Sequence, residues 1–336
     1  MNSGIRKKIC GRSGYILLCA AVSGALLVSL KYGAVDISWQ SIWDFLCGTG
    51  SSDSPDIMIL NQIRLPRTLC AMLSGAALAV SGAILQSVLN NQLASPGITG
   101  VSAGGGLAGI IAMVYFPGSP ERAAAATFCG ALAIAVSVFI LAWKSHASPL
   151  KIILAGVALS SICAALSGTV IFLNSEKAGE LLSFTTGSLT MCNRDNLAAV
   201  FPFAAIGFTG AILMAKQMDI LALGDDTASS LGIPVFRSRL LLLLFSALLA
   251  ASAVSLAGLM GFIGLIVPHA LRLILKSFSN RKLLTYSAIC GAVLLTLCDT
   301  IGRTVAAPAE IPAGIITALL GPPFFFYLLF RKGSSL

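Results

Sequence analysis

Long apolar stretches separated by short polar segments dominate the pattern of this chain. A membrane-spanning helix needs about 20 apolar residues, and ten stretches approach or exceed that length. We therefore predict an all-α polytopic membrane protein with about ten transmembrane helices. The predicted spans cover residues 13–33, 65–88, 98–116, 123–142, 151–173, 197–216, 240–257, 262–275, 283–301 and 312–330.

The composition supports this class. Of the 336 residues, 57% are hydrophobic and only 10% are charged, whereas soluble domains carry about 25% charged residues. The spans and their short connections use the whole chain. We therefore expect residues 1–336 to form a single transmembrane domain, with the lipid bilayer as its main surrounding.

The formal net charge of +9 follows the predicted membrane topology. With the basic segment Arg6–Lys8 on the inner side, that side receives 15 of the 22 Lys and Arg residues and 3 of the 13 acids. This excess is the positive-inside pattern for an even number of spans with both termini in the cytoplasm. The basic charge therefore gives no reason to expect a nucleic-acid partner.

A polar segment, Gly224–Pro234, interrupts the apolar pattern between the spans 197–216 and 240–257. Two glycines bracket a run that can form a helix, and Asp225 and Asp226 stand where a helix N-terminus favours negative charge. We predict one or two short helical turns outside the bilayer. The glycines and the proline that bound this segment indicate a defined surface to which another molecule binds outside the membrane.

Small residues form a stripe on the second span. Gly75, Ala79 and Gly82 fall on one face at helical spacing, which allows a neighbouring helix to approach closely. We predict that this helix is a packing helix.

Motifs for covalent chemistry are weak in this chain. Residues 100–104 read Gly-Val-Ser-Ala-Gly, which matches the nucleophile elbow of hydrolases, but no strand signal precedes them and only His146 and His269 could serve as a base. We expect no catalytic site, no metal site and no bound cofactor. The nine cysteines are interpreted as packing residues, with Cys47 and Cys192 as one outer-side pair that could be oxidised.

Two stretches are too irregular for simple spans. Residues 184–189 are too polar to cross the membrane and predict a short helix that dips toward a central cavity. Residues 258–272 contain glycines at every third position followed by Pro268, His269 and Arg272, which predicts a short, irregular crossing. Further on, Asp299 and Arg303 lie one helical turn apart and predict a local ion pair.

Several separate motifs follow one another in a definite order. They lie at 64–67, 74–76, 81–82, Gln86, 91–97, 223–235, 261–269, 310–314 and 321–324. In this order they resemble the FecCD-type permeases, which are the membrane subunits of bacterial ABC importers for iron–siderophore complexes, haem and vitamin B12. The resemblance covers about residues 60 to 330. Asn91-Gln92 stands where the family more often has Asn-Pro, which affects the turn more than the assignment.

The resemblance implies a multi-pass protein of the bacterial cell membrane that works with partner chains. These are a second permease subunit, identical or similar, two cytoplasmic ATPase subunits that bind ATP and Mg, and an extracytoplasmic binding protein. The polar segment, about 223–235, would form coupling helices that sit in a cleft of the ATPase. The residues assigned to this coupling role are Leu223, Gly224, Asp225, Ala228, Leu231, Gly232 and Pro234.

The resemblance also implies docking and gate residues. Arg64, Arg67 and Arg303 match outer-side arginines that pair with glutamates of the binding protein. The alternative is that they are ordinary interfacial arginines, and Arg64 and Arg67 are equally compatible with snorkelling from the start of the second span.

The inner loop between the fourth and fifth spans narrows the path in related permeases with small hydroxyl residues. Here the corresponding residues are Ser148, Pro149 and Leu150, so proline and leucine replace expected hydroxyls. We offer these three residues as a candidate cytoplasmic gate.

The resemblance leads us to expect that the chain is the permease subunit of an importer for a metal chelate, in the first place a ferric siderophore. Haem and cobalamin are alternative cargoes of the same importer class. An ion-coupled secondary transporter is a different class and predicts carboxylates at mid-membrane depth. Asp299 is the one acid near a span interior, so we rank this class lower. An adjacent ATPase gene would support the importer.

Overall fold

The structure is a computed structural model that describes residues 12–50, 54–144, 149–190, 192–275 and 279–332. These residues are mostly helical and contain no β-strand. The α-helices are α2 (Arg12–Lys31), α3 (Trp39–Cys47), α4 (Pro55–Ile59), α5 (Leu65–Val88), α6 (Val101–Tyr115), α7 (Pro120–Lys144), α8 (Pro149–Leu173), α9 (Ala178–Thr186), α10 (Arg194–Leu213), α11 (Ala215–Leu221), α12 (Asp225–Ser230), α13 (Val235–Ala257), α14 (Ile263–Leu275), α15 (Asn280–Val305) and α16 (Ala313–Lys332).

Each of the ten predicted spans coincides with one long or apolar helix, so the predicted all-α, roughly ten-helix architecture is confirmed. Among the described residues, six helices are long and apolar enough to cross a membrane by themselves. Four more are apolar but shorter: Ile16–Lys31, Val101–Tyr115, Ile263–Leu275 and Ala313–Tyr327. A π-helical turn, η1 (Leu60–Arg64), joins α4 to α5, and a 3₁₀ turn, η2 (Ser175–Lys177), precedes α9.

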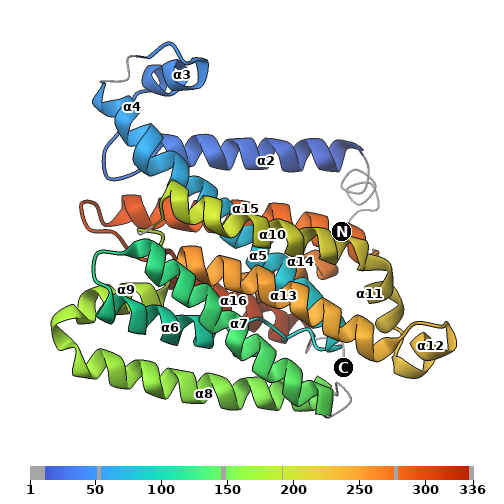
Figure 1. The fold of residues 1–336 in the computed structure, drawn as a ribbon. Helices are drawn as coiled ribbons and strands as arrows, with labels where there is room; N and C mark the ends of the chain where they lie inside the picture. The colour runs from blue at the N-terminus through green and yellow to red at the C-terminus, as the bar shows by residue number, and fades with distance from the viewer. Residues whose placement is uncertain (1–11, 51–53, 145–148, 191, 276–278, 333–336) are drawn as a thin grey trace.

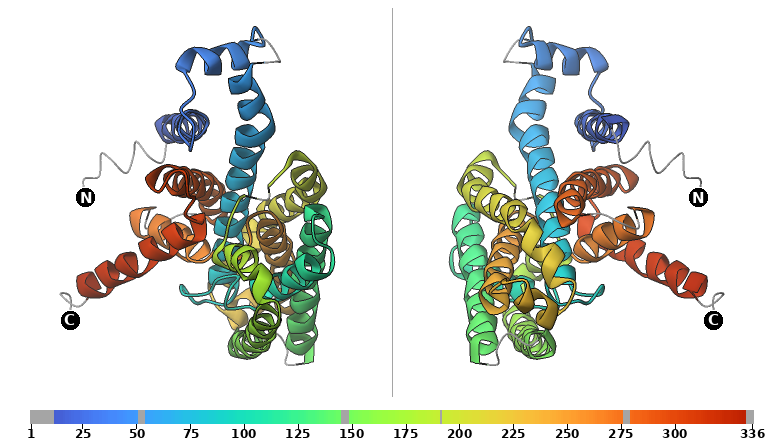
Figure 2. Two further views of the ribbon diagram at one scale, coloured as in Figure 1. Left: turned by 90° about the vertical axis from the view of Figure 1, so that its left-hand side faces the viewer. Right: turned by 90° about the vertical axis from the view of Figure 1, so that its right-hand side faces the viewer.

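Most of the long helices run side by side in one bundle (Figure 1). Helices α11 and α12 lie at one end, toward which α2 begins and α16 ends. We call this the inner end and the opposite end the outer end, following the charge distribution of the sequence. Seen from the ends, α5 passes obliquely through the middle (Figure 2). It contacts α15, α13, α14, α10 and α2, so it is the central helix of the fold.

The small residues on α5 bring its backbone against two other helices. A Cβ atom added to Gly75 would overlap the carbonyl oxygen of Gly291 on α15, and one added to Gly291 would overlap that of Gly75. The Ala79 side chain lies at the same crossing. Farther along α5, a Cβ on Gly82 would overlap the carbonyl oxygen of Gly264 on α14. The predicted stripe therefore faces two partners.

Helix α9 ends beside the outer parts of α13 and α16. The glycine that follows it, Gly187, has φ +83°, and its carbonyl accepts a hydrogen bond of 2.9 Å from the Gly314 backbone at the start of α16. The Phe184 carbonyl accepts one of 3.3 Å from Leu259, just after α13. The stretch predicted as a dipping helix is thus the end of α9, where its irregular backbone is bonded to neighbouring elements.

The glycine crossing generates a paired stability test. Gly291→Ala should lower the thermal unfolding midpoint of the purified protein in detergent, because overpacking a tight contact costs about 1–3 kcal/mol. Gly24→Ala in α2 is the matched control: nothing lies within 4 Å of its added Cβ, and alanine in a helix interior is favoured over glycine by roughly 0.5–1 kcal/mol. Equal midpoints for the two variants would contradict the close approach.

Candidate functional site

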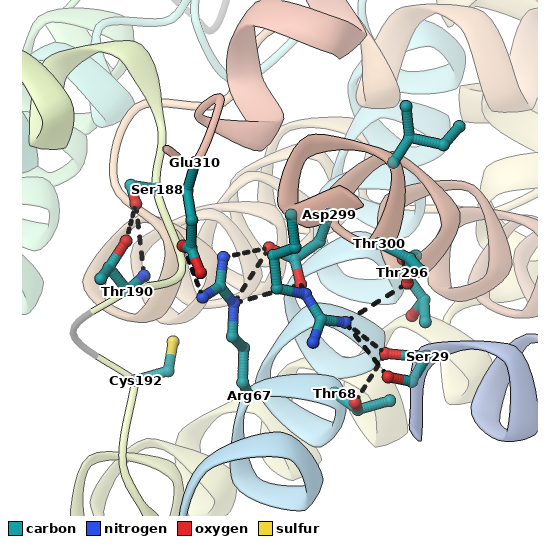
Figure 3. Close-up of polar contacts among 12 residues, drawn as sticks. Ser29, Arg67, Thr68, Ser188, Thr190, Cys192, Thr296, Asp299, Thr300 and Glu310 are labelled. Carbon is teal, nitrogen blue, oxygen red and sulfur yellow. Dashed lines mark hydrogen bonds and ion pairs between the residues drawn. The ribbon is translucent and has the colours of Figure 1, made fainter. Parts of the chain in front are cut away.

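Charged side chains meet at the outer end of α5 and α15. We call Arg67, Asp299, Arg303 and Glu310 the outer charge cluster. The Arg67 guanidinium lies between two carboxylates (Figure 3): its Nη2 donates to Asp299 Oδ1 at 2.9 Å and its Nη1 donates to Glu310 Oε2 at 2.8 Å. On the other side of Asp299, Arg303 Nε lies 3.0 Å from Oδ2. Two cations and two anions therefore balance within the chain.

Helix α2 is tied to this cluster through hydroxyl groups. Arg303 Nη2 donates to Ser29 Oγ at 2.8 Å, and Ser29 Oγ lies 2.8 Å from Thr68 Oγ1. Ser29 and Thr68 are both fully buried. These bonds satisfy donors of Arg303 that would otherwise be unpaired in the interior, which would be costly.

Arg64, three residues before Arg67, binds the end of α2 and not the outer charge cluster. Its Nη1 donates to the carbonyl oxygens of Leu30 and Lys31 at 2.6 and 2.8 Å, and its Nη2 donates to the Val35 carbonyl. A cation at a helix C-terminus satisfies the last carbonyls and is favoured by the helix dipole. Arg64 therefore caps α2.

The three predicted docking arginines are thus bonded inside the chain. Arg64, Arg67 and Arg303 are only 3%, 7% and 4% exposed. Snorkelling, the alternative for Arg64 and Arg67, does not fit this geometry, because both side chains are buried and do not extend into interfacial water. The predicted local ion pair between Asp299 and Arg303 is present. The sequence did not reveal that Asp299 also binds Arg67, because 232 positions separate the two residues.

Helices α11 and α12 form the inner platform, residues 215–230. Its apolar side belongs to the main core: Met218 and Ala228 are fully buried, and Leu221 is 1% exposed. Gly224 and Gly232, with φ +101° and +80°, bracket α12. Both φ values lie in the region that favours glycine, so neither position readily accepts another residue.

The predicted coupling residues lie on and beside α12. Leu223 and Leu231 are 62% and 59% exposed, so two large apolar side chains lie on the surface at the inner end. Asp225 binds Arg239 of α13 through two hydrogen bonds of 2.7 and 3.2 Å, and Arg239 is 2% exposed. Pro234 directly precedes α13. The ion pair fixes α12 to α13 and leaves its other face open.

A series of hydrogen bonds connects the inner platform to α15, α5 and α14. Asp219 Oδ1 on α11 accepts from the Asn280 backbone N–H at 2.7 Å and from Asn280 Nδ2 at 2.9 Å. The Ser87 hydroxyl lies 3.0 Å from Asn280 Oδ1, and Arg272 Nη2 donates to Ser87 Oγ at 2.6 Å. Sequence reasoning missed these residues because only the fold brings them together.

The candidate gate lies only partly in the described structure. Ser148 is outside the described residues, and Pro149 is the first residue of α8. Leu150 is 65% exposed at the inner end of α8. Of the three gate candidates, Leu150 is therefore the one whose side chain the structure describes, and it is exposed.

Cys47 and Cys192 are both free, so the disulfide considered between them is not present. Cys47 is exposed on α3, whereas the Cys192 thiol donates to the Leu256 carbonyl of α13 at 2.9 Å. A hydrogen bond with Cys70, followed by burial, raises the pKa of Cys192 well above its usual range. Its thiol is thus kept protonated and is turned toward the bundle.

Comparisons with known proteins agree on one family. The model of the FecCD transport family matches residues 19–331. The chain is 36% identical to the hemin transport system permease protein HmuU of Yersinia pestis, covering 99% of this chain and 98% of that protein. It is 38% identical to the Fe(3+)-citrate import system permease protein YfmE of Bacillus subtilis, covering 94% of each.

A solved structure is similar over the same extent. It is described as an inward-facing conformation of a transporter assigned to the metal-chelate type of ABC transporters. It matches with a TM-score of 0.83 and 29% identity, covering 94% of this chain and 98% of that chain. The helical arrangement is therefore that of an ABC transporter membrane subunit.

The outer charge cluster predicts unequal effects for its two acids. Asp299→Ala should lower the unfolding midpoint strongly, since removing one partner of a buried ion pair costs about 3–5 kcal/mol. Glu310→Ala should cost about 1 kcal/mol or less, because the Glu310 side chain is 32% exposed and Arg67 keeps Asp299. The measurement is thermal unfolding in detergent, and a larger effect at Glu310 would contradict the assigned pairing.

Proposed function

Because the chain belongs to the FecCD transport family, we propose that it is the permease subunit of a bacterial ABC importer that brings an iron(III) chelate into the cytoplasm. The observation that carries this proposal is the family match over nearly the whole chain, residues 19–331. The relatives that match over 90% or more of their length are permeases of the same kind. The reaction is translocation, with no covalent step in this chain.

The cargo class follows from the relatives and from the side chains. The printed names of the relatives specify hemin and Fe(3+)-citrate. The described residues contain no group of three or more His, Cys, Asp or Glu side chains that could hold a metal ion. We therefore propose that iron passes as an intact chelate whose own chelator supplies the ligands. A ferric siderophore is the first candidate, and haem or cobalamin is the alternative.

The energy is proposed to enter at the inner platform. Two ATPase subunits would bind ATP and Mg and close on each other, and a cleft of each would hold α12. The exposed Leu223 and Leu231 would supply the apolar contact, while Asp225 bonded to Arg239 would transmit the pull to α13. An extracytoplasmic binding protein and a second permease subunit, identical or similar, complete the proposed importer.

The docking role of Arg64, Arg67 and Arg303 stays a proposal. Because these arginines are buried and already bonded, a binding protein would have to displace one of their present partners. Glu310 is the most exposed member of the outer charge cluster and binds Arg67. A carboxylate of the binding protein would reach Arg67 by taking the place of Glu310. Docking would then depend on salt concentration, as charge pairs at exposed rims do.

The chain is proposed to cross the bacterial inner membrane several times, with both termini in the cytoplasm. This orientation rests on the excess of Lys and Arg at the inner end. It places the inner platform with the ATPases and the outer charge cluster with the binding protein.

Uptake tests the proposed function directly. Proteoliposomes with this chain, its ATPase and its binding protein should show ATP-dependent uptake of one chelate among labelled ferric siderophores, ferric citrate, haem and cobalamin. Gly232→Val should reduce uptake by about tenfold or more, because a β-branched residue resists φ +80° and distorts the platform.

Gly118→Val is the matched control for that experiment. Gly118 has φ +74° and open space around it, like Gly232, but it lies in the outer turn between α6 and α7. It should retain most of the uptake. If no ATPase subunit associates with the chain, the proposed function is wrong; if ATP is hydrolysed but nothing is transported, the cargo list is wrong.

The candidate gate has its own test. Leu150→Ala should raise passive leakage of chelate through proteoliposomes without ATP, since a smaller side chain widens the inner end of the path. Leu154→Ala is the control one helical turn farther along α8, where the leucine is similarly exposed at 59%. Unchanged leakage in the Leu150 variant would count against a gate at this residue.

A further inference from the structure

The contact between Asp219 and Asn280 joins the inner platform to the end of a long helix. Asn280 is the first residue of α15, and its backbone N–H is one of the donors that a helix N-terminus leaves without a partner. Asp219 accepts from this N–H and from the Asn280 side chain. A carboxylate at this position also complements the helix dipole. Helix α11 therefore caps α15 from outside its own segment.

The inner platform is packed against the same core as α15, so it does not move independently of the contact between Asp219 and Asn280. Met218 and Leu221 of α11 and Ala228 of α12 are buried in the same core cluster as α5 and α15. Only residues 222–224 separate α11 from α12. A force on α12 is therefore passed to α11 and from there to Asn280.

Helix α15 connects this contact to the opposite end of the molecule. Its 26 residues contain no proline, and at 1.5 Å per residue they span about 39 Å. Asp299 and Arg303 lie near its outer end, within the outer charge cluster. One continuous helix thus carries a polar contact with the platform at one end and the Arg67 contact at the other.

The crossing of α5 and α15 fixes the register of both contacts. Arg67 precedes Gly75 by eight residues, and Asp299 follows Gly291 by eight. Because the helices run in opposite directions, both side chains lie about 12 Å outward of the crossing. On the inner side, Ser87 and Asn280 lie at a similar height and are in contact. Sliding α15 along α5 would break both contacts together.

Given the proposed function, on which this rests, we infer that α15 is the element that transmits ATP-driven movement of the inner platform to the outer charge cluster, with Asp219 and Asn280 as the positioning residues at its inner end. Movement of the platform displaces α15 relative to α5. The displacement weakens the Arg67 contacts with Asp299 and Glu310, and the outer end opens or closes in step with the ATPase.

The test follows the outer end of α15 while the inner contact is changed. Val305, the last residue of α15, is 70% exposed. In the full transporter in proteoliposomes, V305C is labelled with a membrane-impermeant maleimide with and without Mg-ATP. Labelling of residue 305 is quantified by peptide mass spectrometry, which separates it from the native cysteines. We expect ATP to change its labelling rate.

Asn280→Asp places a second carboxylate against Asp219 and should reduce the ATP-dependent labelling change and the uptake by about tenfold, within the usual range of coupling between sites. ATP hydrolysis should continue. The exchange variant D219N/N280D restores one amide and one carboxylate and should recover both readouts to within about threefold of the parent. Recovery by exchange identifies the contact itself and separates it from a general folding defect.

Thr285→Ala is the control on the same helix, because among the described residues the Thr285 hydroxyl donates to the Arg281 carbonyl of its own helix and to no residue of the platform. It should leave both readouts unchanged. Full ATP-dependent labelling in the Asn280→Asp variant, or no ATP response at residue 305 in an importer that takes up chelate normally, would overturn the role of α15. Absence of uptake in the V305C parent and in the unmodified transporter would instead overturn the proposed function, and the role of α15 with it.

Discussion

The contact between the backbones of α5 and α15 at Gly75 and Gly291 determines much of the remaining structure. Inside a bilayer, lipid tails are as apolar as the side chains, so helices associate through close packing and polar contacts. Two glycines facing each other allow the closest approach that helices can make. From this point the antiparallel register follows, and it brings Arg67 to Asp299 and Ser87 to Asn280.

The outer charge cluster shows how this register is made specific. A buried ion pair contributes little net stability compared with apolar residues, but it is costly to break. Asp299 is 2% exposed and is contacted by two guanidinium groups. Arg303 is on the same helix and moves with Asp299, so a shift between α5 and α15 breaks the buried contact with Arg67. Glu310, at the edge of the cluster, is the member that solvent or a partner can reach. The cluster is therefore fixed at the buried Asp299, whereas Glu310 at its edge can give up its contact with Arg67 to another carboxylate.

The sequence predicted the elements better than their contacts. The ten spans follow from hydropathy, because a helix in lipid must satisfy its own backbone groups. Helix α12 could be predicted because Gly224 and Gly232, which bracket it, are visible within one short segment. The partners of Arg67 and Asp219 are 232 and 61 positions away, and no local pattern reports such distances. The resemblance predicted a docking role for Arg64, Arg67 and Arg303, and the structure shows that these arginines have partners within the chain.

In the proposed importer, the two ends of the path must not open together. Charge pairs at one end and hydrogen bonds at the other can enforce this only if they share a rigid element. Helix α15 meets that condition: Asp219 binds its first residue, and Arg67, which also binds Glu310, contacts its outer part through Asp299. The cost of breaking one end independently then includes bending a 26-residue helix that packs closely against α5 at the glycine crossing. In the proposed importer, alternation between the two ends would follow from that shared helix.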